Sequence, residues 1–278
     1  MQSVSVNGKQ AAYGTGGAEW RAGQPLLIFL HGAGGDHTVW ALQARALAQH
    51  GWNVAAPDLP GHGRSADVPG LDSVEALADW AVAFAAALAP GARAAWVGHS
   101  MGACIALTLA ARHPAHAAAL ALVGSGETMR VNPELLDDTL HHKARADAFV
   151  AAFGHGRGAH FGAAAAPGIW MIGATLALLA RCAPASLHRD FAACHVWEGT
   201  PLAARVQCPT LVVSGDADRM TPPKAGQSLA RAIPGARFQT LAQAGHMMML
   251  ETPGPLTAAL RAFLDPLLTR SRDSDSEK

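Results

Sequence analysis

One serine lies in a context that is typical of a catalytic nucleophile. Ser100 is the centre of the motif GHSMG (98–102), between a short apolar run (94–97) and an Ala- and Leu-rich stretch (103–111). The run predicts a strand buried on both faces and the stretch predicts a helix. The glycines allow the sharp turn between them. We therefore expect Ser100 at the carboxyl end of a sheet, beside a helix N-terminus that favours a developing negative charge.

A serine hydroxyl needs a base to take its proton, and His246 is the best placed of the fourteen histidines for that role. It follows the last predicted strand, so we expect it at the same sheet edge as Ser100. The imidazole in turn needs an acid that holds its tautomer. We predict Asp218, three residues after the glycine that ends the preceding strand. Asp216 in the same turn and Glu127 after an earlier strand are the alternatives.

Acyl transfer to a serine also needs hydrogen-bond donors for the negative oxygen that forms on the carbonyl group. The N–H group of Met101, at the predicted helix N-terminus, is one expected donor. The other is expected in the glycine-rich loop 31–35, which follows a predicted strand. Missing side chains there allow the backbone to approach a ligand closely, and the N–H group of Ala33 is the predicted second donor.

The elements around these residues alternate between strand and helix. Asn7-Gly8 predicts an amino-terminal hairpin over residues 3–13. The alternation that follows indicates a parallel sheet covered by helices on both faces. Its predicted members are strand 26–30, helix 38–50, strand 53–56, helix 73–89, strand 94–97, helix 103–111, strand 118–123, strand 209–214, helix 223–232, strand 237–241 and helix 254–268.

The alternation is interrupted by a segment with helical patterns and no convincing strand. We predict a helical cap at 128–204, inserted into a core formed by 1–127 and 205–269. The charged, Ser-rich residues 270–278 predict a disordered tail. Four apolar residues in or beside the cap predict an apolar substrate pocket, although each could instead pack the cap on the core: Trp170, Met171, Phe149 and Met247. Several cap arginines, Arg130 among them, could bind a carboxylate, but charged cap residues are usually solvated.

Composition narrows the function classes. The 278 residues carry a net charge of zero, and no basic cluster predicts binding to nucleic acid or an anionic membrane. The amino terminus lacks the features of a signal peptide, so we expect a cytoplasmic protein. The four cysteines have no C-x-x-C spacing and predict free thiols.

The sequence predicts neither a membrane span nor a metal site. The uncharged stretch 162–180 is long enough to raise the question of a membrane span, but Pro167-Gly168 divides it, so we expect a loop followed by an apolar helix. His155 and His160 lack a third ligand at suitable spacing, so we expect no metal, and we expect no cofactor.

Five motifs together resemble the α/β-hydrolase fold-1 family of serine hydrolases over roughly residues 25 to 265: HGAGG, PDLPGHGRS, GHSMG, SGDADRMTPP and AGHMMMLETP. The resemblance implies a three-layer fold with a mostly parallel eight-stranded sheet, an antiparallel second strand and a helical cap after the sixth strand. It also implies a nucleophile at Ser100, a base at His246, an acid at Asp218, and oxyanion donors at Ala33 and Met101.

The predicted activity is hydrolysis of small to medium, largely apolar carboxylic esters through an acyl-enzyme. A serine nucleophile argues against the dehalogenases and epoxide hydrolases of the family, which use aspartate. Three alternatives remain: cleavage of a C–C bond in dienoic ring-fission products, hydrolysis of lactones or thioesters, and a ligand receptor that keeps the fold without turnover. We expect a small-molecule substrate, and the sequence does not indicate an oligomeric state.

Overall fold

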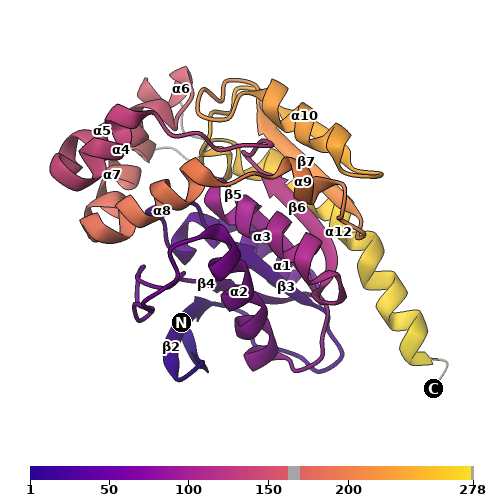
Figure 1. The fold of residues 1–278 in the computed structure, drawn as a ribbon. Helices are drawn as coiled ribbons and strands as arrows, with labels where there is room; N and C mark the ends of the chain where they lie inside the picture. Colours follow the sequence, from indigo (N-terminus) through magenta and orange to yellow (C-terminus); the bar gives the residue numbers. More distant parts are fainter. Residues whose placement is uncertain (162–169, 277–278) are drawn as a thin grey trace.

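An eight-stranded sheet forms the centre of the computed structural model, which describes residues 1–161 and 170–276 (Figure 1). The strands lie in the order β1-β2-β4-β3-β5-β6-β7-β8. Strand β2 is antiparallel to both neighbours, and β3 to β8 run parallel to one another. Their bounds are β1 (Gln2–Val6), β2 (Lys9–Gly14), β3 (Leu26–Leu30), β4 (Asn53–Pro57), β5 (Ala94–His99), β6 (Ala117–Val123), β7 (Thr210–Gly215) and β8 (Arg237–Leu241).

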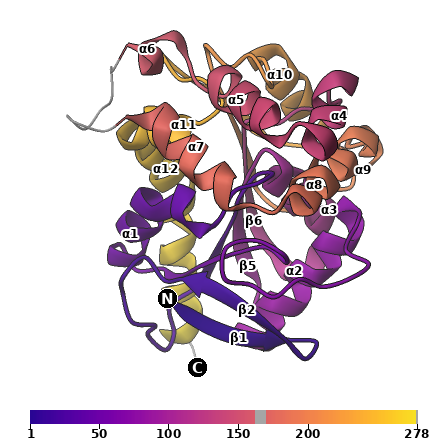
Figure 2. The ribbon, with the colours of Figure 1, turned by 90° about the vertical axis from the view of Figure 1, so that its left-hand side faces the viewer.

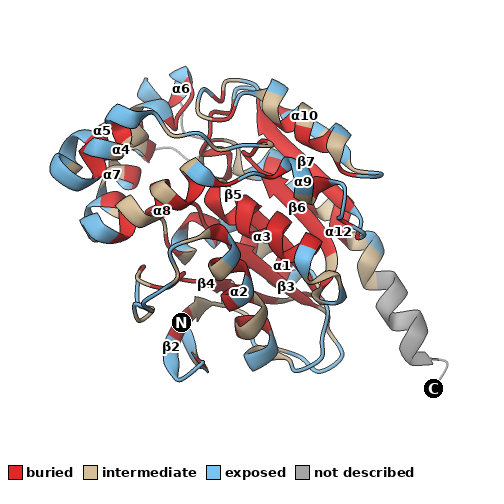
Figure 3. Cartoon of the chain, in the orientation of Figure 1, coloured by how far each residue is buried: buried red, intermediate tan, exposed pale blue. Residues whose placement is uncertain are grey.

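The central strands are buried on both faces because helices cover each side of the sheet. Along β3, Leu26 and Ile28 pack into one hydrophobic cluster, whereas Leu27 and Phe29 pack into another. This alternation is the period of two of a strand, and it explains why β3 is apolar throughout. Figure 3 shows the result as a continuous buried interior across the strands. The mostly parallel fold predicted from the sequence is therefore confirmed.

Two helical layers enclose this sheet. Helices α1 and α12 lie on one side of the strands, and α2 and α3 lie on the other (Figure 2). Helix α10 packs on β7 and β8. The helices and 3-10 turns of the core are η1 (His37–Trp40), α1 (Ala41–Gln49), α2 (Val74–Leu88), α3 (Met101–Arg112), η2 (Pro114–His116), α10 (Pro223–Ala232), α11 (Met248–Glu251) and α12 (Pro253–Ser276).

Helices α4 to α9 follow β6, and Figure 1 shows α4 to α8 gathered beyond one end of the sheet. An antiparallel bridge between Thr128 and Glu198 joins the two ends of this segment. Its helices are α4 (Pro133–His141), α5 (Lys143–Phe153), α6 (Arg157–His160), α7 (Met171–Arg181), α8 (Pro184–Val196) and α9 (Thr200–Ala203). The predicted loop at 162–169 lies outside the described residues.

The structure differs from the sequence-based expectation at two element boundaries. The helix expected at 38–50 begins as the 3-10 turn η1, because the Asp36 side chain accepts a hydrogen bond from the N–H group of Thr38 and caps it there. The expected disordered tail is wrong up to Ser276, where α12 ends. Extending an existing helix fixes one residue per hydrogen bond, so polar residues can continue it.

No single helix among the described residues is long and apolar enough to cross a membrane. Helices α7 and α8 satisfy the length and composition requirement only as a pair, and they meet at an angle of 104°.

Candidate active site

Ser100 occupies a strained turn between β5 and α3. Its backbone has φ 53° and ψ −118°, in the region of positive φ that residues other than glycine rarely adopt. The neighbouring glycines leave no space for a side chain: a Cβ at Gly98 would lie 2.1 Å from the carbonyl oxygen of Gly102. The N–H group of Ser100 donates to the carbonyl of Val123, 2.9 Å away on the next strand. The turn thus presents Ser100 at the carboxyl edge of the sheet.

His246 and Asp218 form a buried hydrogen-bonded pair at the same edge. Asp218 Oδ2 lies 2.8 Å from His246 Nδ1 and accepts a hydrogen bond of 2.7 Å from the hydroxyl of Thr221. Burial alone would raise the pKa of Asp218, but the charge of His246 and these hydrogen bonds outweigh it and hold that pKa below its usual value. The carboxylate therefore stays ionised, and it fixes Nδ1 of the imidazole toward itself, leaving Nε2 for a substrate or nucleophile.

The two alternative acids lie elsewhere. Asp216 is exposed and has no side-chain hydrogen bond to the described residues. Glu127 accepts a hydrogen bond from the hydroxyl of Ser228. Neither contacts His246, so the structure brings only Asp218 to the histidine.

A second histidine, His99, supports the position of His246. Its ring is fully buried beside the ring of His246, with centroids 4.6 Å apart. Nε2 of His99 donates a hydrogen bond of 3.0 Å to the carbonyl of His246. Burial, followed by the neighbouring charge of His246, lowers the pKa of His99 well below its usual value, so this ring is neutral. Sequence analysis did not single out this residue, and its adjacency to Ser100 was the available signal.

The loop after β3 carries free backbone donors. Ala33 lies beside Ser100 on the wall of the site, and its N–H group has no acceptor within residues 1–161 and 170–276. The same holds for the N–H group of Met101 at the start of α3, over the same part of the chain. Because buried N–H groups are nearly always paired, two free donors beside Ser100 suit an oxygen that a substrate brings.

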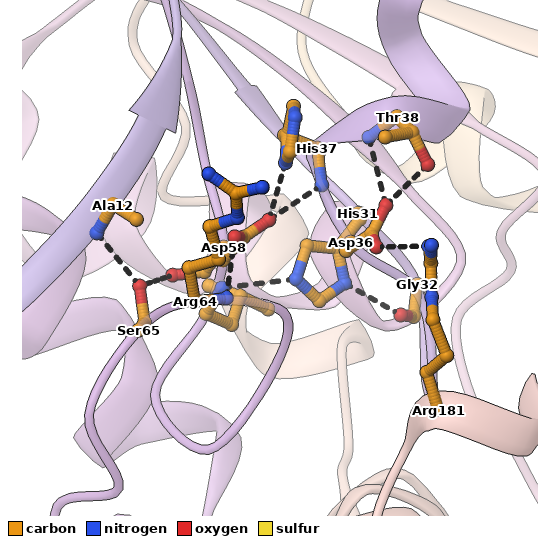
Figure 4. Close-up of polar contacts among 11 residues, drawn as sticks. Ala12, His31, Gly32, Asp36, His37, Thr38, Asp58, Arg64, Ser65 and Arg181 are labelled. Carbon is orange, nitrogen blue, oxygen red and sulfur yellow. Dashed lines mark hydrogen bonds and ion pairs between the residues drawn. The ribbon is translucent and has the colours of Figure 1, made fainter. Parts of the chain in front are cut away.

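A buried histidine, His31, links this loop to the segment after β4 (Figure 4). Nε2 of His31 accepts a hydrogen bond of 2.9 Å from the N–H group of Leu59, so Nδ1 carries the proton and donates to the carbonyl of Gly32 at 2.8 Å. Burial, followed by the charge of His62, lowers the pKa of His31 to about 4. A single neutral tautomer therefore connects the loop to the segment after β4.

A buried carboxylate from α8 holds the loop from the opposite side. Oδ2 of Asp190 accepts hydrogen bonds of 2.9 Å from the N–H group of Gly34 and from Nε2 of His62. Nδ1 of His62 faces the carbonyl of Pro60 at 3.1 Å. Both ring nitrogens face acceptors, so His62 is an imidazolium. Burial opposes the charge, but Asp190 and Cys182 outweigh it and raise the pKa of His62 well above its usual value.

Ion pairs hold the two residues that follow this loop, Asp36 and His37 (Figure 4). Asp58 accepts from the backbone and from Nδ1 of His37, at 2.8 and 2.7 Å, and Asp36 pairs with Arg181 of α7 at 2.7 Å. Asp36, His37 and Asp58 offer atoms within 4.8 Å of one another, which is the spacing of a metal site. These atoms already bond to one another or to Arg181, so the group acts as an ion-pair network within the protein.

Two cavities meet at Ser100 and His246. The small cavity, of about 50 Å³, lies against Val39, Leu178 and Leu179. The large cavity, of about 400 Å³, extends between α4, α5, α8 and the turn after β7. Residues of α5 and α8 therefore line both spaces beside Ser100, and residues of α7 line the small one.

Only two of the four predicted substrate-binding residues reach these cavities. Phe149 lines the large cavity and Met247 the small one. Trp170 is 67% exposed with its ring over Gly173, and Met171 is 3% exposed. Neither lines either cavity: Trp170 precedes α7 and Met171 begins it, whereas the residues of that helix that line the small cavity begin one turn later, at Thr175. Sequence analysis also missed Arg219, which lines the large cavity. The motif SGDADRMTPP was interpreted through its predicted acid, Asp218, and the arginine that follows it was given no role.

Comparisons with known proteins identify the family of this chain. Residues 27–260 match the Alpha/beta hydrolase family. A pimeloyl-[acyl-carrier protein] methyl ester esterase of Neisseria meningitidis serogroup A is 31% identical over 256 residues, which cover 87% of this chain and 77% of that protein.

Solved structures with the same fold cover nearly the whole chain. A thermophilic esterase superposes with a TM-score of 0.79 at 27% identity, covering 95% of this chain and 97% of its own. The enol-lactonase of Burkholderia xenovorans LB400 superposes with a TM-score of 0.84 at 24% identity, covering 95% of this chain and 100% of its own, and shows the likeness of fold. The match over residues 27–260 makes this chain a member of the α/β hydrolase family.

Proposed function

We propose that the protein is a serine hydrolase that cleaves small to medium, largely apolar carboxylic esters. The observation that carries the proposal is the buried pair of Asp218 and His246 beside Ser100, which lies in a strained turn. An ionised acid, an oriented imidazole and a hydroxyl that lines the cavities at one sheet edge are the parts that acyl transfer to serine requires. The names of the esterase relatives, given above, support the same reaction.

The reaction follows from the roles of these groups. Ser100 Oγ attacks the ester carbonyl carbon while Nε2 of His246 takes its proton, and the N–H groups of Ala33 and Met101 stabilise the resulting oxyanion. His246 returns the proton to the departing alcohol, which leaves an acyl-enzyme. Water then attacks the acyl carbon with His246 as base, and the carboxylic acid leaves. Asp218 stabilises the imidazolium in both steps, and no step uses a metal or cofactor.

The proposal assigns the two cavities to the two sides of the ester. The small cavity has room for a short alkyl group such as methyl, and the large cavity has room for the rest of the molecule. The relative from Neisseria meningitidis is named a methyl ester esterase, which supports a small group on one side of the bond.

The proposal includes three further assignments. Residues 128–204 form a cap that sets substrate choice, on a core of residues 1–127 and 205–269. Support comes from Phe149, Leu178 and Phe191 of this segment, which line the cavities. The substrate is a small molecule. The protein acts in the cytoplasm, which is consistent with its four free thiols.

The test is hydrolysis of p-nitrophenyl esters from acetate to decanoate by the native protein and by Ser100→Ala. The proposal predicts a clear optimum of acyl length and loss of turnover in the variant with an unchanged circular dichroism spectrum. Full turnover by Ser100→Ala would refute it. Slow ester hydrolysis combined with fast bleaching of a coloured dienolate would instead identify a C–C bond hydrolase.

A further inference from the structure

Two arginines line the large cavity, and no aspartate or glutamate among the described residues does so. The rest of its wall is mainly apolar, with Phe149 and Phe153 stacked at 4.3 Å between ring centroids. A cavity of this kind suits a molecule with an apolar body and a negatively charged group. The contacts of Arg130 and Arg219 decide which arginine is available for that charge.

The positive charge of Arg130 is already paired with a carboxylate. Its guanidinium forms an ion pair with Glu198 and also donates to the carbonyl of His195. Binding an anion there would require Arg130 to give up a carboxylate partner, which makes it a poor recognition group.

Arg219 has no such partner. No carboxylate lies within 4.0 Å of its guanidinium in residues 1–161 and 170–276. Nη2 of Arg219 donates to the carbonyl of Ala152 at 2.9 Å, and its guanidinium carbon lies 4.5 Å from the centre of the Phe153 ring. These two contacts with the end of α5 hold the side chain in place without cancelling its charge. The guanidinium therefore presents a fixed, unneutralised positive charge at the cavity.

We propose that Arg219 is a specificity-determining residue that binds a carboxylate on the part of the substrate that occupies the large cavity. The guanidinium fork matches the two oxygens of a carboxylate, and its hold on Phe153 reduces the ordering that binding costs. The inference rests on the proposed ester hydrolysis and refines it: the preferred ester combines an apolar chain with a terminal anionic group and has a short alkyl group on the other side of the bond.

The test compares matched charged and uncharged esters. Monomethyl esters of linear dicarboxylic acids are compared with methyl esters of alkanoic acids of the same chain length, with acid release measured at constant pH. A second pair of series, acetates of ω-hydroxy acids and acetates of alkanols, places the charge on the alcohol side. The enzymes are the native protein, Arg219→Met, Arg219→Lys and Arg157→Gln, the last an exposed arginine of α6 that lies on neither cavity.

The proposal predicts that the native protein prefers the charged ester in one of the two series. Arg219→Met should lower the ratio of kcat/KM for that charged ester to kcat/KM for its uncharged counterpart by about fivefold, the size of an exposed ion pair. Arg219→Lys should retain most of the preference, Arg157→Gln all of it, and high ionic strength should reduce it.

Three results would overturn the proposal. One is an equal rate for charged and uncharged esters in both series, and another is a preference that Arg219→Met leaves intact. Either result contradicts the role of Arg219 while ester hydrolysis stands. If no ester, charged or uncharged, is turned over, both this inference and the proposed function fail together.

Discussion

At the scale of single residues, the turn after β7 holds two aspartates with different surroundings. Asp218 is buried against His246, whereas Asp216 is exposed. Sequence spacing favoured Asp218 because a carboxylate three residues past the strand can turn back toward the next loop. The hydrogen bonds from Thr221 that keep Asp218 ionised depend on the folded turn, and sequence spacing does not reveal them.

Asp218→Asn should reduce kcat by about 10⁴-fold, because an amide cannot stabilise the imidazolium and favours the wrong tautomer of His246. Asp216→Asn is the matched control in the same turn and should leave kcat unchanged. The measurement is kcat for p-nitrophenyl acetate together with a thermal unfolding curve. A loss of less than tenfold in folded Asp218→Asn would mean that Asp218 is not the acid of this site.

Phe149→Ala and Trp170→Ala separate the predicted pocket residues that reach the site from those that do not. Phe149 lines the large cavity, so its truncation should lower kcat/KM for longer acyl esters by about tenfold, the value of roughly 1.4 kcal/mol of lost contact. Trp170 lies exposed on Gly173, so its truncation should change kcat/KM little. The reverse order in a series of p-nitrophenyl esters would contradict the observed cavity.

At the scale of elements, Asp190 of α8 holds the loop after β3, which carries the proposed oxyanion donor of Ala33. Asp190→Ala removes the acceptor of the Gly34 N–H group and leaves His62 buried without its partner. We expect a loss of about 3 to 5 kcal/mol in the free energy of unfolding, the usual cost of breaking a buried pair. We also expect a lower kcat with little change in KM, because the loop contacts the transition state more than the substrate.

Arg189→Ala is the control for this variant. Arg189 is the neighbour of Asp190 on α8; it pairs with the largely exposed Asp67 and donates to the carbonyl of Pro60, and none of its hydrogen bonds within the described residues is to the loop after β3. Its loss should reduce the free energy of unfolding by about 1 kcal/mol or less. Equal effects of the two variants on kcat would show that α8 acts through general stability and not through the loop.

The elements themselves were largely predictable. Strand β5 follows from an apolar run bounded by glycines and helix α3 from an Ala- and Leu-rich stretch, and the order of strands and helices between 26 and 123 is confirmed. The expected tail was wrong because residues after Leu268 continue α12, and local composition does not record that a long helix precedes them. Trp170 and Met171 were placed at the site on their apolar character, but the residues of α7 that line the small cavity, Thr175, Leu178 and Leu179, come one or more turns later, and the sequence does not show where along the helix the cavity lies.

At the scale of the whole molecule, the buried pair of His62 and Asp190 connects the loop after β4, the loop after β3 and α8. The pKa of His62 is raised well above 6.5 in the folded protein. Folding then takes up a proton above that pH, so the stabilisation is complete below pH 6.5 and is lost as the pH rises through the raised pKa. Asp190, Cys182 and His31 are the titratable groups that surround His62.

The difference in unfolding free energy between the native protein and His62→Gln isolates this contribution, since other titrating groups are common to both. We expect the difference to be larger at about pH 6 than at about pH 9. Urea unfolding at the two pH values measures it. A difference that does not fall with rising pH would mean that His62 is neutral in the folded protein.

The central claim is that Ser100 is the nucleophile. The most direct test is the intact mass of the protein after reaction with a fluorophosphonate, with the labelled peptide identified by fragmentation. The account predicts one adduct, on Ser100, absent from Ser100→Ala and formed much more slowly in Asp218→Asn. Absence of an adduct on the folded native protein, or an adduct on a different residue, would contradict it.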